Sequence, residues 1–187
     1  GFMEFMNLRI GVNENALIPR PETEELCNLA INENKNNDQL KILDIGTGSG
    51  CIALALKKYL PNSSVTALDI SKKALELASE NAKRNELDIR FLNLDILNTE
   101  LGLPQEFDII ISNPPYIPIS EKEVIHINVK DFEPSNALFV KDEDPLEFYR
   151  AILEFCEAHL KNDRKIYFEI HPQYSSELMD LVKQYPF

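Results

Sequence analysis

Residues 107–116 read FDIIISNPPY, and this stretch decides the fold. Its first half is apolar and rich in β-branched residues, which is typical of a strand buried on both faces of a parallel sheet. We expect the strand to end at Ser112, because Pro114 and Pro115 fix φ and lack backbone donors. An amide, free carbonyls and an aromatic ring therefore follow a central strand at its carboxyl end. Open α/β sheets bind ligands at that end.

The side chains of this stretch suit a planar amino group as a ligand. The side-chain oxygen of Asn113 and the carbonyl of Pro114 can each accept a hydrogen bond, so together they can hold both hydrogens of an NH2 group. Tyr116 can stack on the flat π-system behind it. Such a grip orients a weakly nucleophilic nitrogen, and the reaction then depends mainly on proximity and alignment. A solvated asparagine in an ordinary Pro-Pro loop is the structural alternative.

A second motif lies in residues 41–51, KILDIGTGSGC. A short strand, residues 42–45, leads into a glycine loop and then into an apolar helix. This order is typical of nucleotide-binding sites, where glycines let a ligand approach the backbone closely. The spacing is GxGxG, so the dinucleotide pattern GxGxxG is not met. We take the whole loop as a candidate cofactor site: Gly46, Thr47, Gly48, Ser49 and Gly50.

A predicted second strand, residues 65–69, ends in an acidic residue. Asp69 follows Gly50 by 19 positions, and a carboxylate at this place can bind both hydroxyls of a ribose. Capping of the next helix, residues 72–84, is the alternative role for Asp69. Ser71 already suits that capping role, which favours the ribose interpretation.

A third strand, residues 89–94, is followed by another candidate contact. Asp95 is placed to meet an exocyclic amine, and Ile96 to lie against an adenine face. Capping of the local loop explains Asp95 about equally well, and both interpretations stay open. The strand of 107–112 comes fourth, and we expect it beside the first strand, at the topological switch point of a doubly wound α/β sandwich.

Elements at both ends complete the predicted domain. Residues 1–18 alternate in hydrophobicity before a polar turn at 13–15, which predicts a β-hairpin or a short extended arm. A helix should begin near Pro21, where carboxylates occupy the first turn. Residues 117–144 are mostly polar, as in lids and binding loops. An amphipathic helix (145–160), a fifth strand (165–170) and a last helix (173–185) follow.

Composition restricts the class of protein. The 187 residues carry a net charge of −12 and are 44% hydrophobic, as in a soluble globular domain. This acidity disfavours nucleic acid as the main partner, since phosphate binding needs a basic face. Cys27, Cys51 and Cys156 are widely spaced in apolar surroundings, which indicates reduced core residues of a cytoplasmic protein. Their spacing fits neither a disulfide nor a zinc site. No apolar run reaches the length of a membrane span.

These motifs together resemble a known family. The loop GTGSG followed by Asp69 resembles the class I S-adenosylmethionine-dependent methyltransferases, and NPPY is similar to the signature of those that methylate planar amino groups. With LIPRPETE (17–24) and FEPSNAL (132–138), the chain resembles the HemK/PrmC family. Its members methylate the side-chain amide nitrogen (N5) of the glutamine in the GGQ motif of peptide chain release factors.

The resemblance implies a role for each motif. Residues 46–50 would hold the methionine part of S-adenosyl-L-methionine, Asp69 the ribose, and Asp95 with Ile96 the adenine. The catalytic and substrate-binding set would be Asn113, Pro114, Pro115 and Tyr116, with Asn113 also near the cofactor. The amide nitrogen would attack the sulfonium methyl in line, leaving S-adenosyl-L-homocysteine, with no metal required. The implied protein is a cytoplasmic monomer that acts on release factors and binds neither nucleic acid directly nor membranes.

The resemblance also implies a domain division. Residues 1–18 would be the remnant of a missing N-terminal domain, and residues 19–187 a Rossmann-like catalytic domain that lacks the family's final strand pair. Where the family has Glu-Ile-Gly, this chain has Glu169-Ile170-His171. The alternatives are glutamine methylation of a ribosomal protein, adenine-N6 methylation of nucleic acid, and a non-catalytic adenosine-binding module.

Overall fold

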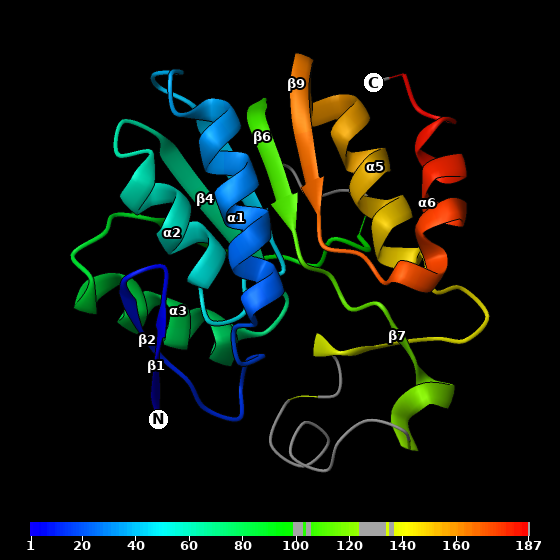
Figure 1. The fold of residues 1–187 in the computed structure, drawn as a ribbon, viewed down its shortest axis with the longest axis horizontal. Coiled ribbons are helices and arrows are strands. Elements are labelled where there is room, and N and C mark those ends of the chain that lie inside the picture. Colours follow the sequence, from blue (N-terminus) through cyan, green and yellow to red (C-terminus); the bar gives the residue numbers. More distant parts are fainter. Residues whose placement is uncertain (99–102, 104–105, 124–133, 135–136, 187) are drawn as a thin grey trace.

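The computed structural model describes residues 1–98, 103, 106–123, 134 and 137–186. A parallel sheet with the strand order β5-β4-β3-β6-β9 forms the centre of the molecule (Figure 1). Every residue of the strand within FDIIISNPPY is buried, as its apolar composition predicts. The strands of this sheet are β3 (Lys41–Ile45), β4 (Ser64–Asp69), β5 (Arg90–Asn93), β6 (Phe107–Ser112) and β9 (Leu160–Phe168).

The order of the strands confirms the predicted topology. The chain passes from β3 outward to β4 and β5, and then returns to place β6 on the other side of β3. Ile45 pairs with Leu68 on one side and with Ser112 on the other. The loops that follow β3, β4 and β6 therefore leave the sheet at one edge, at the topological switch point.

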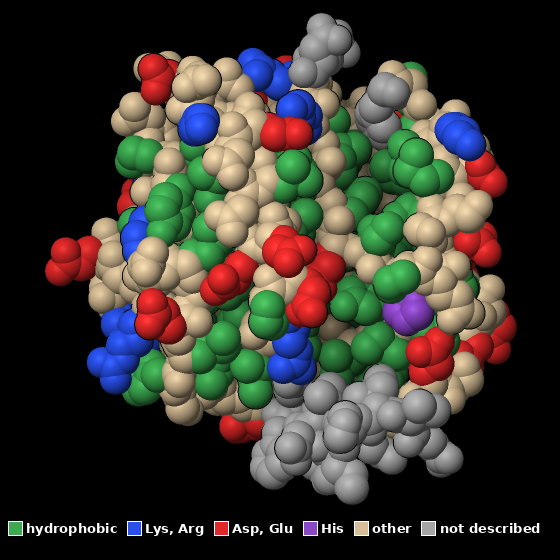
Figure 2. All heavy atoms as spheres, viewed as in Figure 1, with side chains coloured by type: hydrophobic (Ala, Val, Ile, Leu, Met, Phe, Trp, Pro, Cys, Tyr) green, Lys and Arg blue, Asp and Glu red, His purple; other side chains and the backbone are tan. Residues whose placement is uncertain are grey.

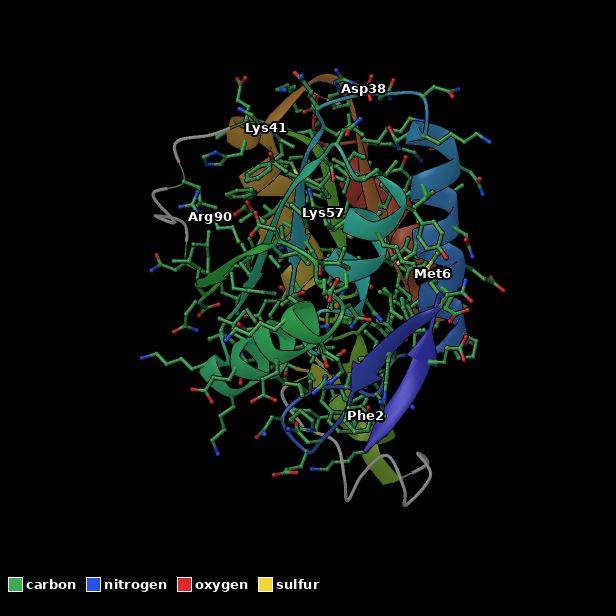
Figure 3. All side chains as sticks on the ribbon, turned by 90° about the vertical axis from the view of Figure 1, so that its left-hand side faces the viewer. Phe2, Met6, Asp38, Lys41, Lys57 and Arg90 are labelled. Atoms are coloured by element: carbon green, nitrogen blue, oxygen red, sulfur yellow. The ribbon has the colours of Figure 1, made fainter. Side chains whose placement is uncertain are left out.

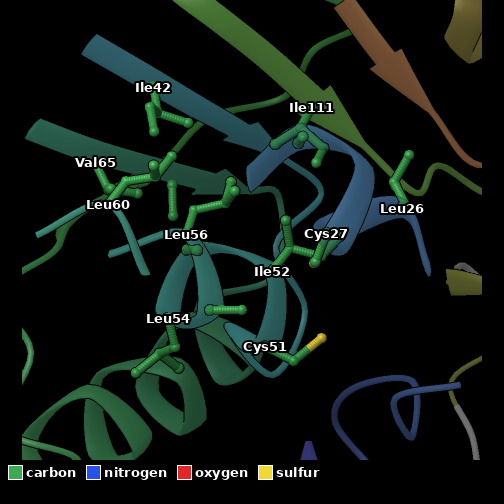
Figure 4. Packing of buried hydrophobic residues seen from close by; sticks show 14 of the residues in the cluster. Leu26, Cys27, Ile42, Cys51, Ile52, Leu54, Leu56, Leu60, Val65 and Ile111 are labelled. Atoms are coloured by element: carbon green, nitrogen blue, oxygen red, sulfur yellow. The ribbon is translucent and has the colours of Figure 1, made fainter. Parts of the chain in front are cut away.

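Helices cover both faces of the sheet, so the fold is the expected α/β sandwich. Alternate strand residues point to opposite faces: Ile42 packs with α1 and α2, whereas Leu43 packs with α5. Figure 4 shows the first of these clusters, in which Ile52 and Leu56 of α2 lie beneath the strands and Leu54 points toward α3. The helices are α1 (Pro21–Asn34), α2 (Cys51–Tyr59), α3 (Lys72–Arg84), α5 (Glu147–His159) and α6 (Ser175–Val182).

Two helix starts follow their sequence signals. Pro21 opens α1, with Glu22 and Glu24 in the first turn, where carboxylates meet the positive end of the helix dipole. Ser71 caps α3, since its side chain accepts a hydrogen bond from the backbone N–H of Ala74 at 3.2 Å. Both predictions are confirmed.

The N-terminal hairpin exists, but its turn is not where the sequence pattern suggested. Strands β1 (Phe2–Phe5) and β2 (Leu8–Gly11) pair antiparallel around a turn at Met6 and Asn7, not at residues 13–15. Both turn residues have positive φ, 48° and 57°. A two-residue turn of this kind matches the right-handed twist of the strands, and asparagine tolerates the conformation well. Figure 3 shows Phe2 and Met6 at opposite ends of the hairpin.

The C-terminal elements differ from prediction in their bounds. The amphipathic helix begins at Glu147, not at Pro145, and the last strand begins as early as Leu160, because that residue already pairs with Phe107 of β6. The last helix is shorter than expected, since η3 (Pro172–Tyr174) precedes α6. In the predicted lid, η1 (Ile119–Glu123) lies next to a small parallel pair, β7 (Ile117–Pro118) with β8 (Phe139–Val140). Residues 124–133 lie outside the described residues.

The three cysteines are buried and free, as predicted. None of the helices in the described part of the chain combines the length and the apolar character needed to span a membrane. The space-filling view shows acidic side chains gathered at the centre of the face that α1 covers (Figure 2).

Candidate active site

The glycine loop after β3 curls around the end of β4. Gly46, Gly48 and Gly50 all have positive φ, between 55° and 83°. The backbone N–H groups of Gly46 and Thr47 both donate to the carbonyl of Leu68, at 2.9 and 3.0 Å. The loop is therefore held against the neighbouring strand by its own backbone.

Two of these glycines serve different purposes. A side chain at Gly50 would have its Cβ 3.0 Å from Cβ of Ala78 and 3.3 Å from Cα of that residue, so Gly50 allows α2 and α3 to pack closely. A Cβ at Gly46 would meet nothing within 4 Å. The space above Gly46 is part of a cavity, which suits a ligand that lies directly on the backbone.

Asp44 supports the loop from below, and sequence reasoning did not single it out. Its Oδ2 accepts hydrogen bonds from the hydroxyl of Thr47 at 2.6 Å and from the backbone N–H of Ala53 at 3.2 Å. Asp44 is fully buried, and this burial raises its pKa to about 7. An acidic residue inside an otherwise apolar strand was the available signal.

Asp69 bonds to two loops at once. Its Oδ2 accepts from the backbone N–H of Gly48 at 2.9 Å, and its Oδ1 accepts from that of Ser71 at 2.8 Å. Burial raises the pKa of the Asp69 carboxyl. The carboxylate also lines the cavity, so it makes the turn-capping bonds of the alternative interpretation while still facing the ligand space.

Asp95 is placed in a similar way. Its Oδ1 accepts from the backbone N–H of Leu97 at 3.0 Å, which is the loop-capping role. Both Asp95 and Ile96 line the same cavity as Asp69. The structure therefore brings both of the predicted adenine contacts to the ligand space without deciding between the two roles of Asp95.

The cavity has a volume of about 240 Å³ and lies at the carboxyl edge of the sheet. Gly50 does not line it. Five residues that were not expected at the cofactor from the sequence do line it: Asn15, Ala16, Leu17, Pro19 and Thr23. The motif LIPRPETE contains most of these residues and was the available signal. The predicted residues that do line the cavity are Gly46, Thr47, Gly48, Ser49, Asp69, Asp95, Ile96, Asn113, Pro114 and Pro115.

A second cavity, of about 200 Å³, lies on the other side of the NPPY motif. Arg20 and Tyr116 line it, and Asn113, Pro114 and Pro115 line both cavities. These three residues thus separate a larger space at the glycine loop from a smaller one next to Tyr116. A molecule in the smaller cavity and a molecule in the larger one would therefore both contact these three residues.

Hydrogen bonds orient the side chains of this motif. The Nδ2 of Asn113 donates to Oγ1 of Thr23 at 3.2 Å, and among the described residues nothing donates to its Oδ1 or to the Pro114 carbonyl. The hydroxyl of Tyr116 donates to Oε1 of Glu169 at 3.2 Å. Burial, reinforced by the charge of Glu169, raises the pKa of Tyr116 to about 12, so this phenol stays protonated near neutral pH.

Of the two histidines in the described part of the chain, His171 lies at this site. Its ring centroid is 5.9 Å from that of Tyr116, and its Nδ1 accepts from the backbone N–H of Gln173. His159 lies at the end of α5, and His126 lies outside the described residues. Within the described part of the chain, no group of three or more His, Cys, Asp or Glu side chains could hold a metal ion.

Comparison with known proteins agrees with this geometry. Residues 26–134, more than half of the chain, match the family model of the methyltransferase small domain. The chain is 53% identical to the release factor glutamine methyltransferase of Flavobacterium psychrophilum, over 100% of this chain and 66% of that protein. It is 43% identical to the protein of the same name from Bacteroides thetaiotaomicron, over 98% of this chain and 65% of that one. It therefore spans about two thirds of the length of these curated relatives, and the resemblance inferred from the motifs is confirmed.

Solved structures confirm the fold. A methyltransferase from Pyrococcus furiosus superimposes with a TM-score of 0.65 at 23% identity, over 95% of this chain and 75% of that one. The ribosomal protein L11 methylase from Lactobacillus delbrueckii subsp. bulgaricus gives a TM-score of 0.63 at 24% identity, over 89% and 69%. At this level of identity the likeness concerns the architecture alone.

Proposed function

The chain belongs to the methyltransferase small domain family, and from that premise we propose that it transfers a methyl group from S-adenosyl-L-methionine to the side-chain amide nitrogen of a glutamine in a peptide chain release factor. The observation that carries the proposal is the position of Asn113. It lies between the two cavities with a side-chain oxygen to which no described residue donates. The names of the relatives, release factor glutamine methyltransferases, indicate the substrate.

The residues of the larger cavity fit this cofactor. The open space above Gly46 admits the amino-acid part against the loop backbone, and the Asp69 carboxylate can accept hydrogen bonds from ribose hydroxyls. The apolar wall that Leu94 and Ile96 contribute suits the adenine ring. When bound, S-adenosyl-L-methionine supplies an electrophilic methyl group on a positively charged sulfur.

The NPPY residues then position the nitrogen. Asn113 Oδ1 and the Pro114 carbonyl each accept one hydrogen of the glutamine NH2 group, which leaves the face of the nitrogen turned toward the larger cavity. The ring of Tyr116 packs against the flat amide from the smaller cavity. The nitrogen would accept the methyl group as the electron pair of the S–C bond passes to sulfur, which would leave as the neutral thioether of S-adenosyl-L-homocysteine. The extra proton would then pass from the nitrogen to solvent water.

Charge favours a protein substrate over a nucleic acid. The net charge is −12, and acidic side chains gather on the face over α1. A polyanion would be repelled there, whereas a neutral or basic protein would not. We propose that the enzyme works as a cytoplasmic monomer, with residues 19–187 as its catalytic unit.

The test is methyl transfer from labelled S-adenosylmethionine by the full-length protein. The acceptors are a release factor, its GGQ→GGE variant and a duplex DNA. Label on the release factor that disappears with the GGE variant is expected. Label on DNA would replace the substrate assignment by adenine methylation, and binding of the cofactor without transfer to any acceptor would replace it by a non-catalytic adenosine-binding module.

A further inference from the structure

Glu169 bonds to residues of the site, but it lines neither cavity and has no role in the proposed function so far. It directly follows β9, next to the end of β6, and its main chain is anchored on both sides. Its N–H donates to the carbonyl of Ser112 at 3.1 Å, and its carbonyl accepts from the hydroxyl of buried Tyr149 at 2.8 Å. The side chain therefore starts from a fixed point at the site.

The carboxylate of Glu169 joins two segments that are far apart in the sequence. Its Oε2 accepts from the hydroxyl of Thr23 at 2.7 Å, and its Oε1 accepts from the hydroxyl of Tyr116 at 3.2 Å. Thr23 belongs to the RPETE segment and Tyr116 to NPPY. Glu169 lines neither cavity, so it contacts these side chains from behind the site.

The direction of these hydrogen bonds follows from chemistry. An ionised carboxylate can only accept, so the single hydroxyl hydrogen of Thr23 points to Glu169. The oxygen of Thr23 is then an acceptor toward Asn113, and only the NH2 end of the amide can face it, as observed at 3.2 Å. A flipped amide would place Asn113 Oδ1 against the Thr23 oxygen with no hydrogen between them.

We propose that Glu169, acting through Thr23, is a positioning residue that selects the orientation of the Asn113 amide. This inference rests on the proposed function, because the selected orientation presents an acceptor to the NH2 group of the substrate. The opposite orientation would present an NH2 group to another NH2 group. Glu169, Thr23 and Asn113 thus form a relay of hydrogen bonds. The Glu169 carboxylate accepts from Thr23, Thr23 accepts from the NH2 group of Asn113, and Oδ1 of Asn113 then faces the substrate as an acceptor.

Two variants in the full-length protein break the relay. Thr23→Val removes the hydroxyl at nearly constant shape, and Glu169→Met removes the acceptor at similar length. Each should lower kcat/KM for the protein substrate roughly 10- to 100-fold, the range expected when a positioning contact is lost. Thr23→Ser keeps the hydroxyl and should stay within about threefold of wild type. Because Glu169 lines no cavity, Glu169→Met should leave the KM for the cofactor unchanged.

A second readout does not depend on the substrate. The side-chain NH2 signal of Asn113 in a ¹⁵N NMR spectrum is identified by its loss in Asn113→Ala. This signal should shift in Thr23→Val and in Glu169→Met, and should stay in place in Thr23→Ser. Tyr116→Phe is the matched control, because it removes the other hydrogen bond to the same carboxylate and should leave the Asn113 signal in place.

The outcomes separate the relay from the proposed function. A wild-type protein that methylates no release factor refutes the function, while the NMR series still tests the relay. The relay is refuted if Thr23→Val leaves the Asn113 signal unshifted, or if Thr23→Ser loses as much activity as Thr23→Val. Equal losses would mean that Thr23 acts through packing and not through its hydroxyl.

Discussion

Asn81 and Gly11 hold each other by two hydrogen bonds. The backbone N–H of Gly11 donates to Oδ1 of Asn81 at 2.7 Å, and Nδ2 of Asn81 donates back to the carbonyl of Gly11 at 3.0 Å. The same Nδ2 donates to the carbonyl of Ser49 at 2.9 Å. One buried side chain in the last turn of α3 therefore ties the N-terminal hairpin to the glycine loop.

The first prediction concerns this link. Asn81→Leu keeps the branched shape of the side chain but leaves the backbone groups of Gly11 and Ser49 without their partner. We expect the free energy of unfolding to fall by about 3 kcal/mol, because buried unsatisfied polar groups are costly. Urea denaturation followed by circular dichroism measures this change.

Asn85 provides the control for that experiment. Asn85 is half-buried and makes the same two-way bond one turn later, with the N–H and carbonyl of Arg9, and both of these bonds are exposed to solvent. Asn85→Ala should cost about 1 kcal/mol or less, since water can replace these bonds. Equal losses in the two variants would contradict the importance that we give to burial.

The second prediction separates two glycines of one loop. Gly50→Ala should lower the free energy of unfolding by about 3 kcal/mol, because positive φ and the contact with Ala78 both oppose a side chain. Gly46→Ala should cost only about 1 kcal/mol from its φ, yet its methyl group would enter the cavity. We therefore expect Gly46→Ala to bind S-adenosylhomocysteine at least roughly tenfold more weakly by calorimetry. Unchanged binding would mean that the cofactor does not lie over Gly46.

The third prediction separates catalysis from cofactor binding. Asn113→Ala removes the acceptor for the substrate NH2 group, and we expect methyl transfer to fall by a factor of about 100 or more. The residues that we assign to the cofactor keep their bonds, so affinity for S-adenosylhomocysteine should change less than about threefold. Parallel transfer assays and calorimetry test this, and an equal loss of both would refute the division of roles.

The fourth prediction concerns pH. Burial raises the pKa of Asp44 to about 7 in the folded protein, whereas in the unfolded chain it is about 3.9. Between these values the folded state holds a proton that the unfolded state has lost, so this carboxyl makes the protein less stable as pH rises. Above pH 7 the effect is complete and adds no further slope.

Asp44→Asn removes that titration and leaves every other group in place. Between pH 5 and 8 the wild type should lose about 3 kcal/mol more in free energy of unfolding than the variant does. Urea midpoints at intervals of one pH unit measure the difference. Parallel curves for the two proteins would show that Asp44 titrates in its ordinary range in the folded state.

Much of the fold could be predicted from local pattern. The apolar strands, the glycine loop and the Pro-Pro exit from β6 are each specified by neighbouring residues, through hydrophobic periodicity and restricted φ. The turn of the hairpin was misplaced because apolar Met6 occupies it, so the hydrophobic pattern continues through the turn. The start of the last strand was similarly hard to predict, since Leu160 suits either the end of the preceding helix or the pairing with β6.

The sequence by itself determined which chemical groups stand at the carboxyl ends of the strands. Parallel strands bring those ends to one edge, so Asp69, Asp95 and Asn113 were expected to meet around one ligand space. Only the tertiary structure decided which polar atoms pair there. Thr23 and Glu169 are 146 residues apart, and their bond depends on how α1 packs and how β9 registers against β6. Such pairings have no local signature, because they result from the packing of the whole chain.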